Sequence, residues 1–186
     1  YYQHANQFVT EIEDGNAAGM QTLGQVSEVA FMVLVPFFLK RFGMKLTLLI
    51  GMLAWGARYV LFAYGNAGEL LFLLILGIAL HGVCYDFFFV SGQVFTDSKA
   101  GPRYKSAAQG LITLATYGVG MLIGFWVAGQ LTDAFAVGDG AHHWRSIWLY
   151  PAAFAGLVAV LFALLFRNEV VAYQAAPSGT PARDHG

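Results

Sequence analysis

Residues 70–97 are the stretch that most constrains how this chain can fold. The stretch begins as an unbroken apolar run that, as a helix, is long enough to cross a lipid bilayer. It then places His81, Tyr85 and Asp86 at a depth where hydrocarbon would surround them. A carboxylate at membrane depth costs several kcal/mol, so it is rarely present without a use. We therefore expect these polar side chains to serve a function inside the membrane.

The composition indicates an integral membrane protein. Of the 186 residues, 58% are hydrophobic and 11% are charged, against roughly 25% charged in soluble domains. The apolar runs are too many, and too far from the start, to be a cleaved signal peptide. A formal net charge of −1 argues against nucleic-acid binding, which needs a basic surface. Cys84 is a single cysteine and the histidines are scattered, so we expect neither a disulfide nor a metal site, and no other cofactor.

The connections between the apolar segments differ in charge. Residues 40–45 and 98–105 carry Lys and Arg, whereas residues 66–69 and 132–144 carry none. By the positive-inside rule, the basic connections should be cytoplasmic and the other two external. The tail, residues 168–186, should be a disordered cytoplasmic segment. The predicted membrane spans are residues 20–40, 46–65, 70–97, 107–130 and 145–166, preceded by residues 1–16 as the end of a sixth helix.

Polar side chains recur at helical spacing in three of these segments. One helix carries Gln21, Gln25 and Glu28 within roughly 60° of arc, a stripe that should face protein or a water-filled cavity and not lipid. Amides and carboxylates bind hydroxylated or heterocyclic solutes, and aromatic rings stack on flat ones. The segments therefore favour a neutral polar ligand with an aromatic part. The other groups are Gln3 with Asn6, and His81 with Tyr85, Asp86 and the phenylalanines at 87–89.

Glu28 and Asp86 are the candidate proton carriers. A carboxylate whose surroundings change between two conformations can bind and release a proton. Arg58 lies about seven residues from the outer end of its helix and Glu28 about eight, so the two share a height and a charge pair is a hypothesis.

Alternatives to these roles stay open. Arg58 can instead extend toward the outer headgroups, and the carboxylates can serve only to hold helices together. The phenylalanines at 87–89 can contact lipid. Residues 1–16 can be an exposed amphipathic terminus.

Four motifs carry a resemblance to a known family. They are QTLGQVSE at 21–28, FFLKRFG at 37–43, WGARY at 55–59 and HGVCYDFF at 81–88. With them, residues 1–167 resemble the C-terminal half of the nucleoside:proton symporter family of the major facilitator superfamily. The resemblance implies an all-α integral membrane protein of twelve helices in two six-helix halves, with alternating access to a site near the bilayer midplane. Residues 1–16 would end helix 7 and form an external loop, and residues 17–167 would be helices 8–12.

The resemblance also implies a site. Side chains of helices 7 and 8 contact the nucleoside in this family, and they map onto Gln3, Asn6, Gln25 and Glu28. Helix 10 contributes an aromatic residue followed by an aspartate, here Tyr85 and Asp86. This chain departs from relatives that carry Phe or another aromatic by having Tyr85 and, one turn earlier, His81, a further candidate for substrate binding, so the resemblance leaves the base preference open.

We therefore predict a proton-coupled nucleoside transporter of the bacterial inner membrane, monomeric when complete. Because the sequence opens at Tyr1, we expect a fragment that lacks the N-terminal half and so one wall of the site. One rival is a proton symporter for sugars or oligosaccharides, since amides and carboxylates bind hydroxyls equally well. The other is an intramembrane enzyme that uses Glu28, His81 or Asp86 as acid and base, but no nucleophile–base pair is evident, so we expect no enzyme.

Overall fold

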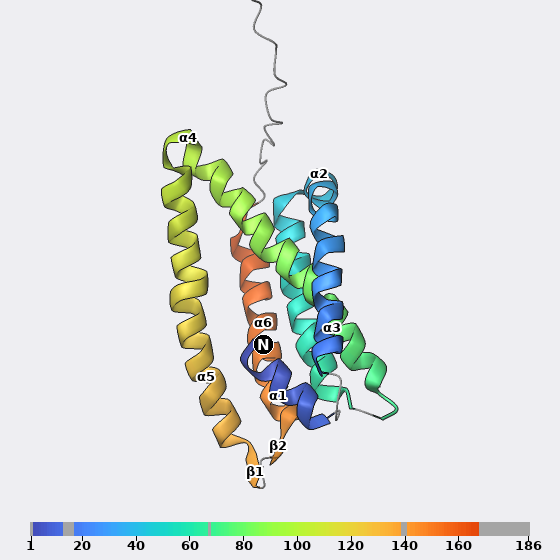
Figure 1. Cartoon of the computed structure of the whole chain (residues 1–186). Coiled ribbons are helices and arrows are strands. Elements are labelled where there is room, and N and C mark those ends of the chain that lie inside the picture. The colour runs from blue at the N-terminus through green and yellow to red at the C-terminus, as the bar shows by residue number, and fades with distance from the viewer. Residues whose placement is uncertain (1, 13–16, 67, 139–140, 168–186) are drawn as a thin grey trace, which may run out of the picture.

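The computed structural model of the chain is almost entirely helical (Figure 1). It describes residues 2–12, 17–66, 68–138 and 141–167, and the predicted tail lies outside these residues. The elements are α1 (Tyr2–Ile12), α2 (Ala17–Tyr64), α3 (Leu71–Tyr85), the π-helix η1 (Asp86–Val90), α4 (Ser91–Thr113), the π-helix η2 (Leu114–Gly120), α5 (Met121–Ala134), β1 (Ala136–Gly138), β2 (Ala141–His142) and α6 (Trp144–Leu165).

Two glycines fold long helices back on themselves. Gly43 (φ 76°, ψ 174°) reverses α2 and Gly101 (φ 68°, ψ 170°) reverses α4, both in a backbone region that is essentially restricted to glycine. The predicted basic connections are therefore turns centred on one residue. Both turns lie at one end of the molecule, whereas the start of α3 and the strands β1 and β2 lie at the other (Figure 1).

Three helical stretches of the described chain are long and apolar enough to cross a membrane. They are Thr22–Tyr64, Leu71–Ala134 and Trp144–Leu165, and the first two contain the glycine turns. The sequence analysis divided the same part of the chain into five spans, whose outer ends lie within a few residues of the ends of these three stretches. The sequence analysis did not foresee η1 and η2, where the helix widens by one residue per turn, or the short β1–β2 hairpin inside the connection at 132–144.

The first half of α2 and helix α3 cross with their backbones nearly touching. A Cβ built on Gly82 would lie 2.5 Å from the backbone C and O of Ser27, and the Gly82 amide donates to the Ser27 hydroxyl over 3.1 Å. In the second half of α2, Gly51 makes a similar approach, its Cβ position lying 2.9 Å from the Phe88 amide nitrogen of η1. These contacts fix the helices on which the polar residues lie.

An aromatic cluster closes the end of the bundle that holds the hairpin. Phe8 of α1 lies 5.2 Å from the Trp144 ring and 5.3 Å from the Trp148 ring, centroid to centroid. Glu11 of α1 accepts from the Trp144 indole over 2.6 Å and contacts His142 over 3.0 Å. The short helix α1 is thereby attached to the start of α6 (Figure 1).

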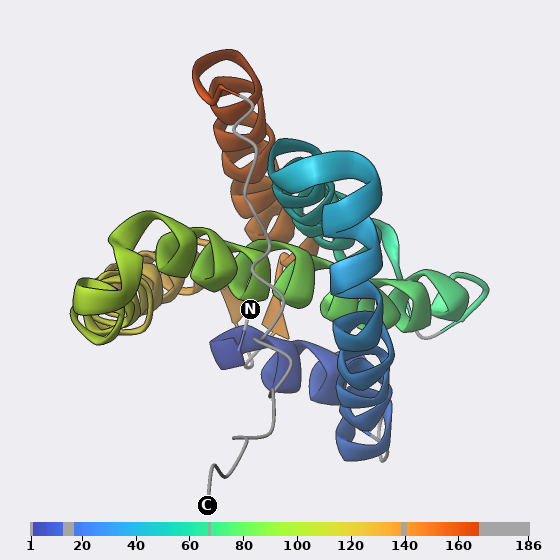
Figure 2. The same ribbon diagram turned by 90° about the horizontal axis from the view of Figure 1, so that it is seen from above.

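Most of helix α5 lies apart from the other helices (Figures 1 and 2), and it makes a small contact with α1. Its side chains are mostly exposed, including Leu122 (73%) and Trp126 (68%). Gly120 and Gly124 form a GxxxG spacing that typically lets helices pack closely. A Cβ on Gly124, however, would meet no described atom within 4 Å. No described helix therefore packs against the face of α5 that carries Gly124.

Candidate functional site

A chain of polar contacts joins three helical segments. The Arg58 side chain, in the second half of α2, is fully buried, and its Nη1 lies 2.8 Å from His81 Nδ1 in α3. On the other side of the imidazole, His81 Nε2 lies 3.7 Å from Glu28 Oε2 in the first half of α2. The predicted relation between Glu28 and Arg58 thus includes a histidine that contacts both.

The close crossing at Gly82 explains why these residues meet. Gly82 follows His81 in the chain and contacts the backbone of Ser27 and Glu28. Gly24, one turn before Glu28, would place a Cβ 3.5 Å from His81 Cβ. Small residues on both helices therefore bring Glu28 beside the imidazole.

Asp86 has the least satisfied side chain of the group. It is fully buried, and neither of its carboxylate oxygens has a hydrogen-bond partner among the described residues. Asp86 opens η1, and π-helical turns inside α-helices are frequent at functional sites. Its carboxylate is also near enough to that of Glu28 for the two to interact electrostatically. A buried acid without partners is costly to keep, which is typical of groups with a function.

The aromatic residues near Asp86 are largely used in packing. The Tyr85 and Tyr117 hydroxyls are hydrogen-bonded to each other, which connects α3 to η2. Phe87 is buried and its ring lies 4.6 Å from that of Phe38, whereas Phe89 lies 5.4 Å from the Trp55 ring. Phe87 therefore packs in the interior of the helix bundle and is exposed neither to lipid nor to an open site.

The remaining predicted residues lie on the same helices. Gln25 is exposed and lies one turn before Glu28 in α2. Gln3 and Asn6 are in α1, and the placement of their side chains lies outside what the structure describes, as does that of Gln21. The structure thus brings Glu28, Arg58, His81, Tyr85 and Asp86 together and does not test the reach of the α1 amides.

Two features of the site escaped the sequence analysis. Tyr117 is a partner of Tyr85 although the two are 32 positions apart, and no short-range pattern signals that contact. Gly82 stands directly after His81, and a glycine inside an apolar helix is a signal of close backbone approach that could have been used.

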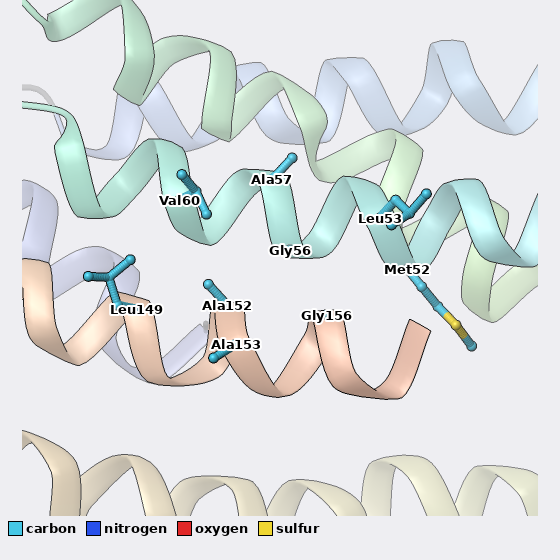
Figure 3. A pocket seen from close by; sticks show the side chains of 9 residues that line it. All are labelled: Met52, Leu53, Gly56, Ala57, Val60, Leu149, Ala152, Ala153 and Gly156. Atoms are coloured by element: carbon cyan, nitrogen blue, oxygen red, sulfur yellow. The ribbon is translucent and has the colours of Figure 1, made fainter. Parts of the chain in front are cut away.

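An apolar groove of about 500 Å³ lies elsewhere, between the second half of α2 and α6 (Figure 3). Its lining includes Met52, Gly56, Leu149 and Gly156 and none of the polar site residues. Among the described residues, no group of three or more His, Cys, Asp or Glu could hold a metal ion.

Comparison with known proteins gives consistent results. Residues 1–170 match the family described as nucleoside H⁺ symporters. The chain is 43% identical over 182 residues to the putative nucleoside transporter YegT of Escherichia coli (strain K12), which covers 92% of this chain and 43% of YegT. It is 40% identical over 147 residues to the xanthosine permease of the same organism, covering 78% of this chain and 35% of the permease.

A solved structure agrees with these matches. A crystal structure of a point mutant of the nucleoside transporter NupG superposes with a TM-score of 0.82 at 29% identity, covering 88% of this chain and 43% of that one. The chain therefore spans less than half the length of the relatives that it matches. With a family match over nearly all of its described residues, the chain belongs to the nucleoside H⁺ symporter family.

Proposed function

We propose that the complete transporter containing this chain carries nucleosides across the bacterial inner membrane by proton-coupled symport. The observation that carries the proposal is a pair of carboxylates, Glu28 and Asp86, inside helices of a membrane bundle. One of them is half-buried beside a histidine, and the other is fully buried without a partner among the described residues. Membership of a family of nucleoside H⁺ symporters supplies the solute and the ion.

The proposed architecture follows from the glycine turns. With α2 and α4 each reversed once, the described helices would make five membrane crossings, and α1 would be the end of a sixth. The turns at Gly43 and Gly101, together with the C-terminal tail, would be cytoplasmic, since these segments carry the basic residues. In this proposal the chain forms one six-helix half of the transporter, monomeric when complete, and the other half supplies the second wall of the site.

The proposed solute contacts lie around the crossing of α2 and α3. Gln25, Glu28 and His81 offer donors and acceptors on adjoining helices, and the Tyr85 ring lies 5.7 Å from that of His81. A nucleoside has hydroxyls for such groups and a flat base for the rings. Gln3 and Asn6 of α1 would add amides from the preceding helix.

The proposed proton carriers are Asp86 and Glu28. Both lie inside helices of the bundle, and a carboxylate that is secluded from water favours its protonated form. Exposure of either group to water in the other conformation of the transporter would favour release of the proton. Alternation between the two conformations thereby couples the proton to the solute.

The test is radiolabelled uridine uptake by the complete transporter in proteoliposomes. With an imposed inward proton gradient, uridine should accumulate above its external concentration, and without the gradient it should only equilibrate. Unlabelled nucleosides should compete and free sugars should not, because sugars lack the base. Uptake that ignores the gradient, or that sugars inhibit as strongly as nucleosides, would refute the proposal.

A further inference from the structure

The contact between Arg58 and His81 fixes the chemical form of the imidazole. A guanidinium has only hydrogen-bond donors, so at a separation of 2.8 Å His81 Nδ1 must be the acceptor. A nitrogen that accepts carries no proton. In the neutral ring the proton is then on Nε2, which is the nitrogen that faces the Glu28 carboxylate. The order of contacts thus runs from donor Arg58, through His81, to acceptor Glu28.

The Arg58 side chain is itself held firmly. It is fully buried, its guanidinium lies 5.4 Å from the centre of the Phe62 ring, and Nη1 also lies 3.6 Å from Cys84 Sγ. His81 and Cys84 are three residues apart and so share one face of α3. The guanidinium therefore contacts two successive positions of that face, and this restricts the rotation of the imidazole.

We infer that Arg58 is a positioning residue that holds His81 as the Nε2–H tautomer, so that His81 donates toward Glu28 and orients its carboxylate for the solute. The role of Glu28 in this inference rests on the proposed function, whereas the tautomer does not. Within five residues of His81 along α3 and η1, the other titratable groups are Cys84, Tyr85 and Asp86.

One consequence concerns the path of the transported proton. A second proton on His81 would have to enter at Nδ1, where it would break the contact with Arg58 and place an N–H against a cation. His81 therefore orients a carboxylate and does not itself carry the transported proton. The carriers are left as Glu28 and Asp86.

The first test reads the tautomer directly. The complete transporter is labelled with ¹⁵N-histidine in lipid nanodiscs, and the His81 signals are assigned as those lost in His81→Asn. We expect an unprotonated Nδ1 and a protonated Nε2 throughout the pH range of transport. In Arg58→Met both tautomers should appear, and Arg58→Lys, which retains a donor, should restore the single form in part. A protonated Nδ1 in the wild type, or an unchanged spectrum in Arg58→Met, overturns the inference.

The second test replaces His81 with glutamine or asparagine, whose side-chain amides each take the place of one nitrogen of the imidazole. A glutamine at position 81 extends to about the place of Nε2 and keeps a donor toward Glu28, whereas an asparagine reaches only to about the place of Nδ1. Because His81→Asn removes the donor that faces the Glu28 carboxylate, we expect it to raise the KM for uridine about tenfold or more. His81→Gln should raise it less. Equal KM values for the two variants would contradict the inference.

A double-mutant cycle tests whether Arg58 acts through His81. Arg58→Met should raise KM in the wild type and change it little in His81→Gln, because the route through Nδ1 is already absent. If the fold-change in KM of the double variant equals the product of the fold-changes of the two single variants, Arg58 acts by another route. If the complete transporter shows the single tautomer but moves no nucleoside, the proposed function fails and the assignment of the tautomer stands.

Discussion

At the scale of residues, the site combines groups of very different surroundings. Glu28 is half-buried and in contact with His81, whereas Asp86 is buried with no hydrogen-bond partner among the described residues. The sequence predicted both acids from their depth in apolar segments. It could not predict that His81 lies between Glu28 and Arg58. The depth of a residue along its helix gives its height in the membrane, but it does not show which other helix places a side chain beside it.

Glu28→Gln should abolish concentrative uptake by the complete transporter. A glutamine keeps the shape and a hydrogen-bond acceptor but cannot bind and release a proton, and it removes the charge that faces His81 Nε2 at 3.7 Å. Uridine accumulation under a proton gradient should fall on the order of tenfold or more. Glu69→Gln, at an exposed acid in a connection, is the control and should accumulate uridine normally. Normal accumulation by Glu28→Gln would exclude Glu28 as a carrier.

Asp86→Asn should uncouple uptake from the proton gradient while leaving thermal stability intact. The side chain makes no hydrogen bond with the described residues, so the neutral amide removes none and avoids burying a charge. We expect equilibrium binding of uridine to persist and the melting temperature not to fall. Retained coupling would mean that Asp86 is structural, and a fall in melting temperature would indicate partners that the amide cannot serve.

At the scale of elements, the sequence predicted the helices well and their irregularities poorly. Apolar length and basic connections located the outer ends of the three apolar helical stretches to within a few residues, since both depend on composition within a short window. The π-helices η1 and η2 depend on how neighbouring helices pack, so no local pattern reveals them. The predicted loops at residues 40–45 and 98–105 proved to be turns at single glycines, because a positive φ lets the chain reverse at one residue.

Gly82→Ala should destabilise the protein because the new methyl group would lie 2.5 Å from the Ser27 backbone. The helices would have to separate, and such overpacking typically costs about 1–3 kcal/mol. A lower melting temperature and a raised KM for uridine are expected together, since Glu28 and His81 flank the contact. Gly92→Ala is the matched control, since its Cβ would meet nothing within 4 Å. Equal melting temperatures for the two variants would show that the helices do not cross so closely.

At the scale of the whole molecule, apolar side chains remain exposed over large areas. Most of helix α5 lies apart from the bundle (Figure 2). Its Leu122, Ile123 and Trp126 side chains are exposed, and a large apolar surface of this kind is unfavourable in water. Lipid and the other half of the proposed transporter are the surroundings that suit such faces. The overall arrangement was predictable only through resemblance to a family, because neither hydropathy nor charge specifies which helices neighbour one another.

Cysteine labelling should establish the proposed orientation in the membrane. In intact cells, a membrane-impermeant maleimide should react with Glu69→Cys, in an external connection, and should not react with Lys99→Cys, beside the Gly101 turn. After permeabilisation both should react, since both positions are exposed. The native Cys84 is buried and should stay unlabelled, so it serves as the internal control. The opposite pattern would invert the topology.

The crossing at Gly82 has a consequence for selectivity. Where two helix backbones are in contact, neither helix can move to accommodate a ligand without moving the other helix as well. In the proposed transporter, a solute held at Glu28 and His81 would therefore meet a site whose shape is set before binding, and little ordering would remain on binding. Such a rigid site would select its solute by shape.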